Sequence, residues 1–350
     1  MTDVVIAGAS GFIGGHLADA LRRDGRAVRT IGRSTTGQHR ADASWGDADA
    51  LTRAVDGAGL VINLAGKPVH ARYGDASRDE ILRSRVETTR QLGEAISRAA
   101  APPPVWLNQS TATAYSHSTS HAHTEDDPVG QQGFSEDVAR AWERELEAAD
   151  APATRKVAMR TTIALGHDSE ATRLLFRLAR LGLGGPQIDG WWFPHDRYRG
   201  LAADRGTDEA REPSRGHRTR GRQRFSWIHI DDVVGAVRHI EGTPELVGPV
   251  NFAAPEASTN AELMRLLRQT VRMPIGIPAP RFVLEPATWA LRTESELLLK
   301  SRWVAPGRLL ATGFAFQHPR LDWALRAVWA RMRAGAEDEG PFGPPSRRQR

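Results

Sequence analysis

Three glycines near the start of the chain have the spacing of a phosphate-binding turn. Gly8, Gly11 and Gly14 follow the apolar run at 4–6, and apolar residues at helical spacing come directly after them. Small residues let a backbone approach a pyrophosphate, and a helix N-terminus offers free N–H groups and a positive dipole end. A plain strand-to-helix turn has the same appearance, but the position of the triplet favours a dinucleotide site. The residues predicted to form it are Gly8, Ser10, Gly11, Phe12, Ile13 and Gly14.

The end of the second predicted strand, over residues 27–31, favours NADP over NAD. NAD-preferring sites commonly place an acidic residue there for the ribose hydroxyls, whereas this chain has Gly32, Arg33 and Ser34. Arg33 can pair with a 2′-phosphate and stack on adenine, and Ser34 can donate a hydrogen bond. The alternative is that Arg33 is an ordinary surface residue in an arginine-rich chain. We therefore expect NADPH as the cofactor, with Arg33 and Ser34 among its contacts.

Three further apolar segments end in small or polar residues. They cover 59–66, 105–110 and 157–166, and the hydroxyls of Thr111, Thr113 and Tyr115 follow the second. Ligands of open parallel sheets bind at the carboxyl ends of the strands, so these ends are expected to share one crevice. The additional cofactor contacts predicted there are Leu64, Ala65, Gly66, Ser110, Arg160, Thr162 and Ile163.

The chain resembles the atypical, extended short-chain dehydrogenases/reductases. Within them it is similar to the NAD-dependent epimerase/dehydratase-like epimerase-family proteins that carry a characteristic C-terminal domain of the DUF1731 type. The resemblance covers most of residues 1–330 and implies an NADP-binding Rossmann fold followed by a smaller domain on the substrate side. It rests on AGASGFIGGHL at 7–17, NLAG at 63–66, SRVETT at 84–89, RTTIALG at 160–166, GLGGP at 182–186, FSWIHIDD at 225–232 and ESELLLKSRWVAPGRLLATGFAFQHP at 294–319.

The proton-transfer pair that is usual in this superfamily is missing. There a Ser or Thr acts with Tyr-x-x-x-Lys, in which Tyr is the acid/base and Lys lowers the pKa of that Tyr. The matching segment of this chain has Phe134 in place of Tyr and Val138 in place of Lys. Ser110 and Tyr115 are the candidate catalytic residues, because Tyr115 is the tyrosine that closely follows a predicted strand end. Tyr115 is equally compatible with a pocket wall or a structural hydrogen bond.

Two other polar segments have simpler interpretations. Residues 117–127 combine histidines with carboxylates, but no regular ligand spacing is present, so we predict a loop over the crevice and no metal site. Residues 140–146 indicate an amphipathic helix whose charges lie mostly on a solvated face. Asp231 and Asp232 precede an apolar helix at 233–240 and are expected to cap it, with His229 in a structural role.

Composition narrows the class of protein. The 350 residues carry a net charge of +5, yet the basic residues gather in 191–224 and the last five positions, so we expect no nucleic-acid partner. No cysteine is present, which excludes disulfides and thiolate chemistry. No apolar run approaches the roughly 20 residues of a membrane span, and the chain enters a strand at Val4 without a basic leader. We expect a cytoplasmic protein with no membrane partner, and its oligomeric state stays open.

The fold class predicted from these elements is α/β, a Rossmann doubly wound parallel sheet with a smaller, mostly helical C-terminal domain on the substrate side. The expected divisions are an NADP-binding domain at 1–190, a partly disordered arginine-rich insertion at 191–224 and a return to the sheet at 225–255. A C-terminal domain at 256–333 and a flexible tail at 334–350 complete the chain.

Two functions follow from these patterns. The first is that of an NADP(H)-dependent oxidoreductase or epimerase acting on a small carbonyl or sugar-like substrate. The alternative is a nucleotide-sensing or regulatory protein that keeps the fold, has lost the chemistry and binds a partner, possibly in cell division. The absence of the Tyr/Lys pair favours the alternative, and a pocket that retains Tyr115 favours the first.

Overall fold

The computed structural model describes residues 2–36, 40–69, 73–131, 133–190, 192–193, 200–201, 219–290 and 296–338. Its centre is a seven-stranded sheet with the order β11-β6-β5-β4-β1-β2-β3, in which every neighbouring pair is parallel. The strands are β1 Val4–Ala7, β2 Val28–Gly32, β3 Ala43–Ser44, β4 Leu60–Asn63, β5 Val105–Thr111, β6 Arg155–Thr161 and β11 Gly248–Phe252. The chain reverses its direction of winding between β1 and β4, so the predicted doubly wound Rossmann fold is confirmed.

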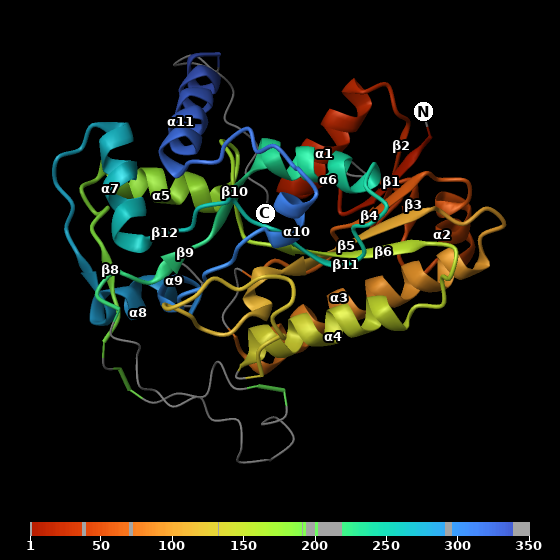
Figure 1. The fold of residues 1–350 in the computed structure, drawn as a ribbon, viewed down its shortest axis with the longest axis horizontal. Coiled ribbons are helices and arrows are strands. Elements are labelled where there is room, and N and C mark those ends of the chain that lie inside the picture. Colours follow the sequence, from red (N-terminus) through yellow and green to blue (C-terminus); the bar gives the residue numbers. More distant parts are fainter. Residues whose placement is uncertain are drawn as a thin grey trace.

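Helices cover both faces of this sheet (Figure 1). On one face, Val4 and Ile6 of β1 pack with helices α1 (Phe12–Arg23) and α6 (Ile230–Glu241). On the other face, Val5 and Ala7 pack with α2 (Ala48–Val55) and α3 (Asp75–Arg98), and α4 (Phe134–Ala148) lies beside α3. Successive strand residues point to opposite faces, and both faces are buried, so β1 is a continuous apolar run.

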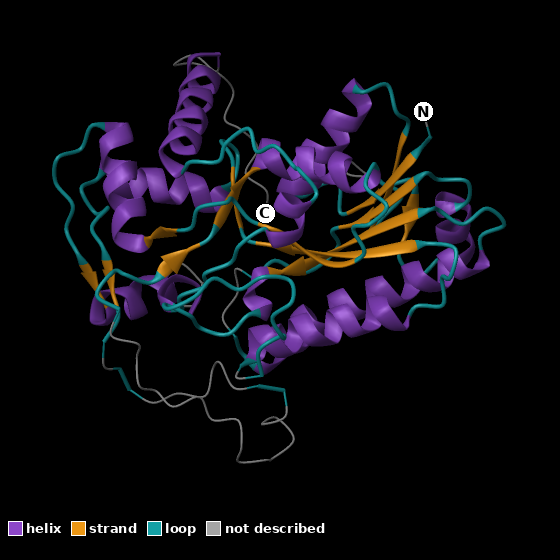
Figure 2. Ribbon diagram, in the orientation of Figure 1, coloured by secondary structure: helices purple, strands orange, loops and turns teal. Residues whose placement is uncertain are grey.

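A second helical layer lies past the carboxyl ends of the strands, on the left in Figure 1 and Figure 2. Helices α5 (Glu170–Arg180), α7 (Asn260–Val271) and α11 (Leu321–Asp338) share one apolar core, so the helical region includes α5 as well as residues after 256. Short helices follow one another between α7 and α11, namely α8 (Arg281–Ala290), α9 (Glu296–Leu299) and α10 (Gly307–Ala311). A 3-10 turn, η1 (Ala112–Ala114), follows β5.

Three two-stranded sheets connect this layer to the main body. They pair β7 (Ile163–Leu165) with β10 (Trp227–His229), β9 (Arg224–Phe225) with β12 (Ser258–Thr259), and β8 (Gln187–Ile188) with β13 (Ala279–Pro280). Helix α11 continues to Asp338, so the first residues of the expected tail at 334–350 are helical. Most of the expected insertion, at 191, 194–199 and 202–218, lies outside the described residues. No helix within the described ranges is long and apolar enough to span a membrane.

The predicted capping role of Asp231 and Asp232 is wrong. The N-cap of α6 is His229, whose Nδ1 accepts a hydrogen bond from the backbone N–H of Asp231. Asp232 is fully buried, and its carboxylate accepts hydrogen bonds from the N–H groups of Gln317 and His318. The carboxylate therefore fastens the segment between α10 and α11 to α6, a long-range role that the helix-start pattern cannot reveal.

Candidate functional site

Two glycines of the glycine turn, residues 8–14, have no room for a side chain. Gly8 has φ +82°, and a Cβ on it would lie 2.9 Å from the carbonyl carbon of Leu64. A Cβ on Gly14 would lie 2.3 Å from the carbonyl oxygen of Gly8. The N–H of Gly11 donates to that same oxygen at 3.1 Å. Glycine is thus required at two of the three predicted positions, because β1, the turn and α1 approach one another closely.

The first turn of α1 presents unused donors. The N-cap Gly11 makes no side-chain cap hydrogen bond, and the first turn of the helix contains no acidic residue. Ser10 and Gly11 are exposed, and Phe12 and Ile13 are half-buried. The first N–H groups of an α-helix have no partner within the helix, and they lie at the positive end of its dipole. The turn can therefore bind an anion through backbone groups alone.

Leu64, Ala65 and Gly66 lie beside this turn. The N–H of Leu64 donates to the carbonyl oxygen of Ala7 at 2.9 Å, which extends the β1–β4 pairing to the edge of the sheet. The side chain of Asn63 turns back and accepts from the N–H of Ala65 at 3.1 Å. These contacts place the small-residue turn after β4 against the glycine turn after β1, as the sequence predicts.

Arg33 and Ser34 follow β2 at the same edge and differ in their availability. Arg33 is exposed, and among the described residues it makes no hydrogen bond or ion pair. The Ser34 hydroxyl accepts from the N–H of Thr36 at 3.1 Å and lies 3.2 Å from the carbonyl oxygen of Thr36. The guanidinium is therefore free for a ligand, whereas the hydroxyl already stabilises a local turn.

The ends of β5, β6 and β11 hold a polar network that consists of Ser110, Tyr115, Glu143, Arg160 and Asn251. Ser110 Oγ donates to Glu143 Oε1 at 2.6 Å, and Arg160 donates to both carboxylate oxygens of Glu143 at 2.8 and 2.7 Å. Arg160 also donates to the Tyr115 hydroxyl, which donates in turn to Asn251 Oδ1, both at 2.8 Å. Every polar group that these bonds join is thereby paired.

Burial gives this network its electrostatic character. Tyr115 is 0% exposed and Arg160 is 5% exposed. Burial raises the pKa of the Tyr115 hydroxyl, and the positive charge of Arg160 opposes this only in part. Burial also acts to lower the pKa of Arg160, but the hydrogen bonds and charge of Glu143 outweigh it and raise that pKa. Arg160 therefore stays charged and Tyr115 stays neutral across the physiological pH range.

The sequence analysis missed two residues of this network, Asn251 on β11 and Glu143. Glu143 lies on α4, on the helix expected to carry its charges on a solvated face, yet its side chain is only 16% exposed and forms an ion pair with Arg160. Its neighbour Glu145 pairs with Arg90 at the exposed surface, as expected. Helical phase does not separate Glu143 from Glu145, because both lie at the border of the buried face of α4; the role of Glu143 depends on its long-range contact with Arg160.

Phe134 and Val138 lie in an apolar cluster with Tyr73 and Ile81. The positions that match the usual Tyr and Lys thus pack in this cluster, where the Arg78 guanidinium also lies 4.2 Å from the centre of the Phe134 ring. A lysine nevertheless reaches the same turn of α4, because Lys300 Nζ lies 2.8 Å from Oε1 of the buried Glu136. Among the described residues, this turn of α4 is therefore contacted by the Lys300 ammonium group from the C-terminal region, but α4 itself provides no tyrosine hydroxyl there.

The remaining predicted contacts flank the end of β6. The Thr162 hydroxyl donates to the carbonyl oxygen of Phe252 at 2.8 Å, and Ile163 is 40% exposed. The structure therefore brings the glycine turn, Arg33, Leu64–Gly66 and Ile163 to one edge of the sheet. The side chains of Ser110 and Arg160 point instead toward α4, and that of Tyr115 points toward β11.

A doubly wound sheet with a glycine turn after β1 and a helical layer past the carboxyl ends of its strands defines a protein of the extended short-chain dehydrogenase/reductase type. The chain belongs to the NAD dependent epimerase/dehydratase family, whose family model matches residues 4–249. A second model, the domain of unknown function DUF1731, matches residues 279–328. The resemblance drawn from the sequence is therefore confirmed in both parts.

Relatives match almost the whole chain. The epimerase family protein SDR39U1 of Bos taurus is 32% identical over 333 residues, which cover 93% of this chain and 99% of the relative. The epimerase family protein YfhF of Bacillus subtilis (strain 168) is 25% identical over 332 residues, which cover 94% of this chain and 98% of the relative.

Solved structures agree with this relationship. The human epimerase family protein SDR39U1 (isoform 2), crystallised with NADPH, has a TM-score of 0.76 and 29% identity, and the match covers 93% of this chain and 98% of that one. MoeE5 in complex with UDP-glucuronic acid and NAD has a TM-score of 0.66 at 20% identity, over 95% of this chain and 99% of that one, a likeness of fold alone.

Proposed function

We propose that this protein binds NADP(H) at the carboxyl edge of its sheet and uses it on a small carbonyl or sugar-like substrate. The observation that carries the proposal is Arg33, an exposed guanidinium without a described partner, at the end of β2 and beside a glycine turn. No carboxylate stands at Gly32, Arg33 or Ser34 to pair with ribose hydroxyls or repel a phosphate. The NADPH bound to the human relative supports this choice.

The residues of this edge fit such a cofactor by their chemistry. The glycine turn, with Ser10, Phe12 and Ile13, offers backbone donors for the pyrophosphate. Arg33 supplies the charge for a 2′-phosphate, and Ser34 offers its backbone while its hydroxyl serves the turn. Leu64, Ala65 and Gly66 supply a small-residue wall, and Ile163 and Thr162 flank the far end. Ser110 and Arg160 contribute indirectly, because their side chains hold the strand ends against α4.

When bound, the nicotinamide supplies the hydride chemistry. The chain's own polar side chains at the ends of β5 and β6 then hold in place the strand ends on the substrate side of the crevice. Ser110 and Tyr115 are already engaged with Glu143, Arg160 and Asn251, so we propose that they position the β5 end rather than exchange protons with substrate. A small-molecule substrate and a cytoplasmic location complete the proposal.

A regulatory, nucleotide-sensing role is the second candidate. Its supporting observation is the apolar environment of Phe134 and Val138, which leaves α4 without a proton donor at the usual place. Under this alternative the cofactor binds without turnover, and the nucleotide controls the affinity for a partner.

Calorimetry with NADPH and NADH tests cofactor binding. We expect the wild type to favour NADPH by about 1–3 kcal/mol, the range of charge-assisted hydrogen bonds. Arg33→Met removes that preference while the NADH affinity stays unchanged. Arg83→Met, at an exposed arginine on α3 that pairs with Asp79, is the matched control and changes neither affinity. Equal affinities of the wild type for the two nucleotides would refute the assignment of NADP.

Turnover is tested separately by following NADPH oxidation across a panel of ketones, aldehydes and keto-sugars. Oxidation that depends on one substrate class supports the enzyme. Tight NADPH binding with no oxidation across the panel favours the regulatory alternative.

A further inference from the structure

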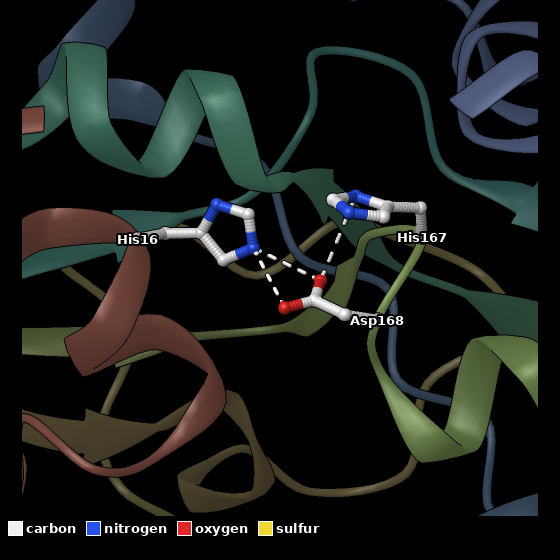
Figure 3. Close-up of side chains that lie close together, drawn as sticks. All are labelled: His16, His167 and Asp168. Atoms are coloured by element: carbon white, nitrogen blue, oxygen red, sulfur yellow. Dashed lines mark hydrogen bonds and ion pairs between the residues drawn. The ribbon is translucent and has the colours of Figure 1, made fainter. Parts of the chain in front are cut away.

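A compact cluster of metal-type ligands lies outside the crevice, on the side of α1 that faces the loop between β7 and α5. His16 projects from α1, and His167 and Asp168 project from that loop. Figure 3 shows the Asp168 carboxylate between the two imidazole rings, with one ring on each side. One ligand atom from each residue lies within 4.8 Å of the other two.

The spacing of these atoms is close to that of a coordination sphere. His16 Nε2 lies 2.9 Å from Asp168 Oδ1 and 3.1 Å from Oδ2, and His167 Nδ1 lies 3.7 Å from Oδ1. Two ligands on a tetrahedral zinc ion, with bonds of about 2.0–2.1 Å, are about 3.4 Å apart. The observed separations lie on either side of that value, so small side-chain movements bring the three ligands onto one ion.

His167 supplies a second observation that points to a ligand. Its Nδ1 atom is buried and makes no hydrogen bond among the described residues, and the Asp168 carboxylate lies 3.7 Å from it. A buried ring nitrogen without a partner is costly in a folded protein, and a metal ion removes that cost.

Two other clusters contain similar residue types but are less suited to a cation. At His229, Asp231 and His318, the Asp231 carboxylate already receives two hydrogen bonds from Arg331, at 3.1 and 2.9 Å. A guanidinium thus occupies the place of the cation.

In the loop that the sequence analysis considered, Asp127 Oδ2 accepts from the N–H of Thr124 at 2.7 Å and closes a turn. The other oxygen of Asp127 lies 3.9 Å from His123 Nδ1. At Asp231 the two imidazole nitrogens lie at similar distances, 3.5 Å for His229 Nδ1 and 3.3 Å for His318 Nε2, so it is the pairing with Arg331 and not the spacing that sets the Asp231 cluster apart from the one around Asp168.

We propose that His16 Nε2, His167 Nδ1 and the Asp168 carboxylate bind one divalent transition-metal ion of the zinc type, with water as the fourth ligand. Imidazole and carboxylate together suit such ions. A ring nitrogen that binds a metal ion carries no proton, so His16 binds the ion in the tautomer that has its proton on Nδ1. Arg173 and Arg331 act against the cation, but Arg331 is paired with Asp231 and Arg173 is hydrogen-bonded to the backbone of His167.

The proposed metal site lies close to the glycine turn. The ring of Phe12, in the first turn of α1, lies 5.2 Å from the ring of His16, and a Cβ on Gly166 would touch that same phenyl ring. An ion at His16 would therefore join α1 to the β7–α5 loop directly behind the turn. The site is a structural cross-link and not part of the catalytic edge.

The test uses the full-length protein, freed of metal with a chelator that is then removed. Titration with ZnCl₂ is expected to raise the thermal midpoint, and CoCl₂ is expected to give a visible absorption that saturates at one equivalent. His16→Gln, His167→Gln and Asp168→Asn each lower the Co²⁺ affinity at least ~10-fold, since even outer-shell changes cost 10–100-fold. His239→Gln, at a histidine bonded to Thr312, is the matched control and leaves the Co²⁺ affinity unchanged.

Circular dichroism of each variant without metal establishes that it is folded. No rise of the thermal midpoint with Zn²⁺ in the wild type overturns the proposal. So does a Co²⁺ spectrum that survives His167→Gln, or one that is lost in His229→Gln or His123→Gln and kept in His16→Gln. None of these readouts depends on NADPH, so the metal site and the proposed function fail or stand separately.

Discussion

The glycine turn after β1 and the polar network after β5 and β6 lie at the same edge of one sheet. They differ in whether their polar groups already have hydrogen-bond partners. The turn leaves backbone N–H groups of α1 without a side-chain cap, and nearby Arg33 is exposed and unpaired within the described residues. In the network, Ser110, Glu143, Arg160 and Tyr115 are buried or nearly so and satisfy one another. The first region has spare hydrogen-bonding capacity, and the second has little.

This difference indicates where a ligand can gain free energy. A ligand at the glycine turn meets donors that are otherwise bonded to water, so each new bond adds to the binding free energy. A ligand at the network has to break existing buried bonds first, at the full cost of leaving their partners unpaired. We therefore interpret the turn as the cofactor-binding region and the network as its support.

Removal of the charge at the centre of the network is expected to have the largest effect on stability. Arg160→Met leaves Glu143 as a nearly buried carboxylate without its cation, and it takes a donor from Tyr115. Loss of one partner of a buried ion pair typically costs about 3–5 kcal/mol of the free energy of unfolding. Urea denaturation measures this change. The control is Arg90→Met, which breaks the exposed pair with Glu145 and is expected to cost less than about 1 kcal/mol.

A side chain introduced at Gly14 is expected to disrupt the glycine turn by steric overlap and not by a change of charge. A Cβ on Gly14 would lie 2.3 Å from the Gly8 oxygen, whereas one on Gly15 would lie 3.7 Å from the Ala9 oxygen, an ordinary contact. Gly14→Ala should lower the free energy of unfolding by about 1–3 kcal/mol, as overpacking does, and weaken NADPH and NADH alike. Gly15→Ala, one residue further along α1, should instead add up to about 1 kcal/mol. Equal results for the two variants in urea denaturation and calorimetry would contradict the close approach of turn and strand.

The two regions also differ in how far the sequence alone predicts them. The glycine turn is local, because strand, turn and helix follow one another within 4–23, and its spacing identifies it directly. The network joins residues that are far apart, such as Tyr115 and Asn251, separated by 136 positions. His16 and Asp168 are separated by 152 positions, so no spacing rule brings them together either. Asp232 is an example of error, since a local pattern predicted a cap and a long-range contact determined its role.

A third polar region lies around His229 at the start of α6. It is expected to make the stability of the protein depend on pH. His229 is 0% exposed, and among the described residues its Nε2 has no hydrogen-bond partner. Burial, and then the charge of His318, lowers the pKa of His229 from 6.5 to about 3, while Asp231 opposes this shift. Between these pH values the unfolded chain binds more protons, so stability is present above pH 6.5 and is lost as the pH falls toward 3.

Urea denaturation at pH 7 and pH 5 measures this contribution to the free energy of unfolding. The wild type is expected to lose about 2 kcal/mol more than His229→Asn over that interval. Asparagine retains an oxygen that can cap α6, so the comparison isolates the titration of the imidazole. Identical pH dependence in the two proteins would mean that His229 is protonated without cost in the folded state.

The smallest effect on stability is expected at Tyr115, where the comparison of the two regions is tested most directly. Tyr115→Phe removes the hydroxyl that accepts from Arg160 and donates to Asn251, while the ion pair between Arg160 and Glu143 remains. The expected loss is about 1 kcal/mol of the free energy of unfolding, with NADPH affinity unchanged. A proton donor to substrate would behave differently, since general acid catalysis contributes about 10²–10⁴ in rate.

Any substrate found in the carbonyl panel separates the two roles of Tyr115. If its hydroxyl only holds the end of β5, kcat in Tyr115→Phe falls less than about tenfold, and the pH dependence of kcat keeps its shape. Ser110→Ala, which removes a different hydroxyl of the same network, then gives a similar small change. A fall of 10²-fold or more in Tyr115→Phe alone would show that the buried phenol leaves Asn251 during turnover. In that case the network is part of the catalytic site. The burial and pairing of its groups then do not show that their role is only structural.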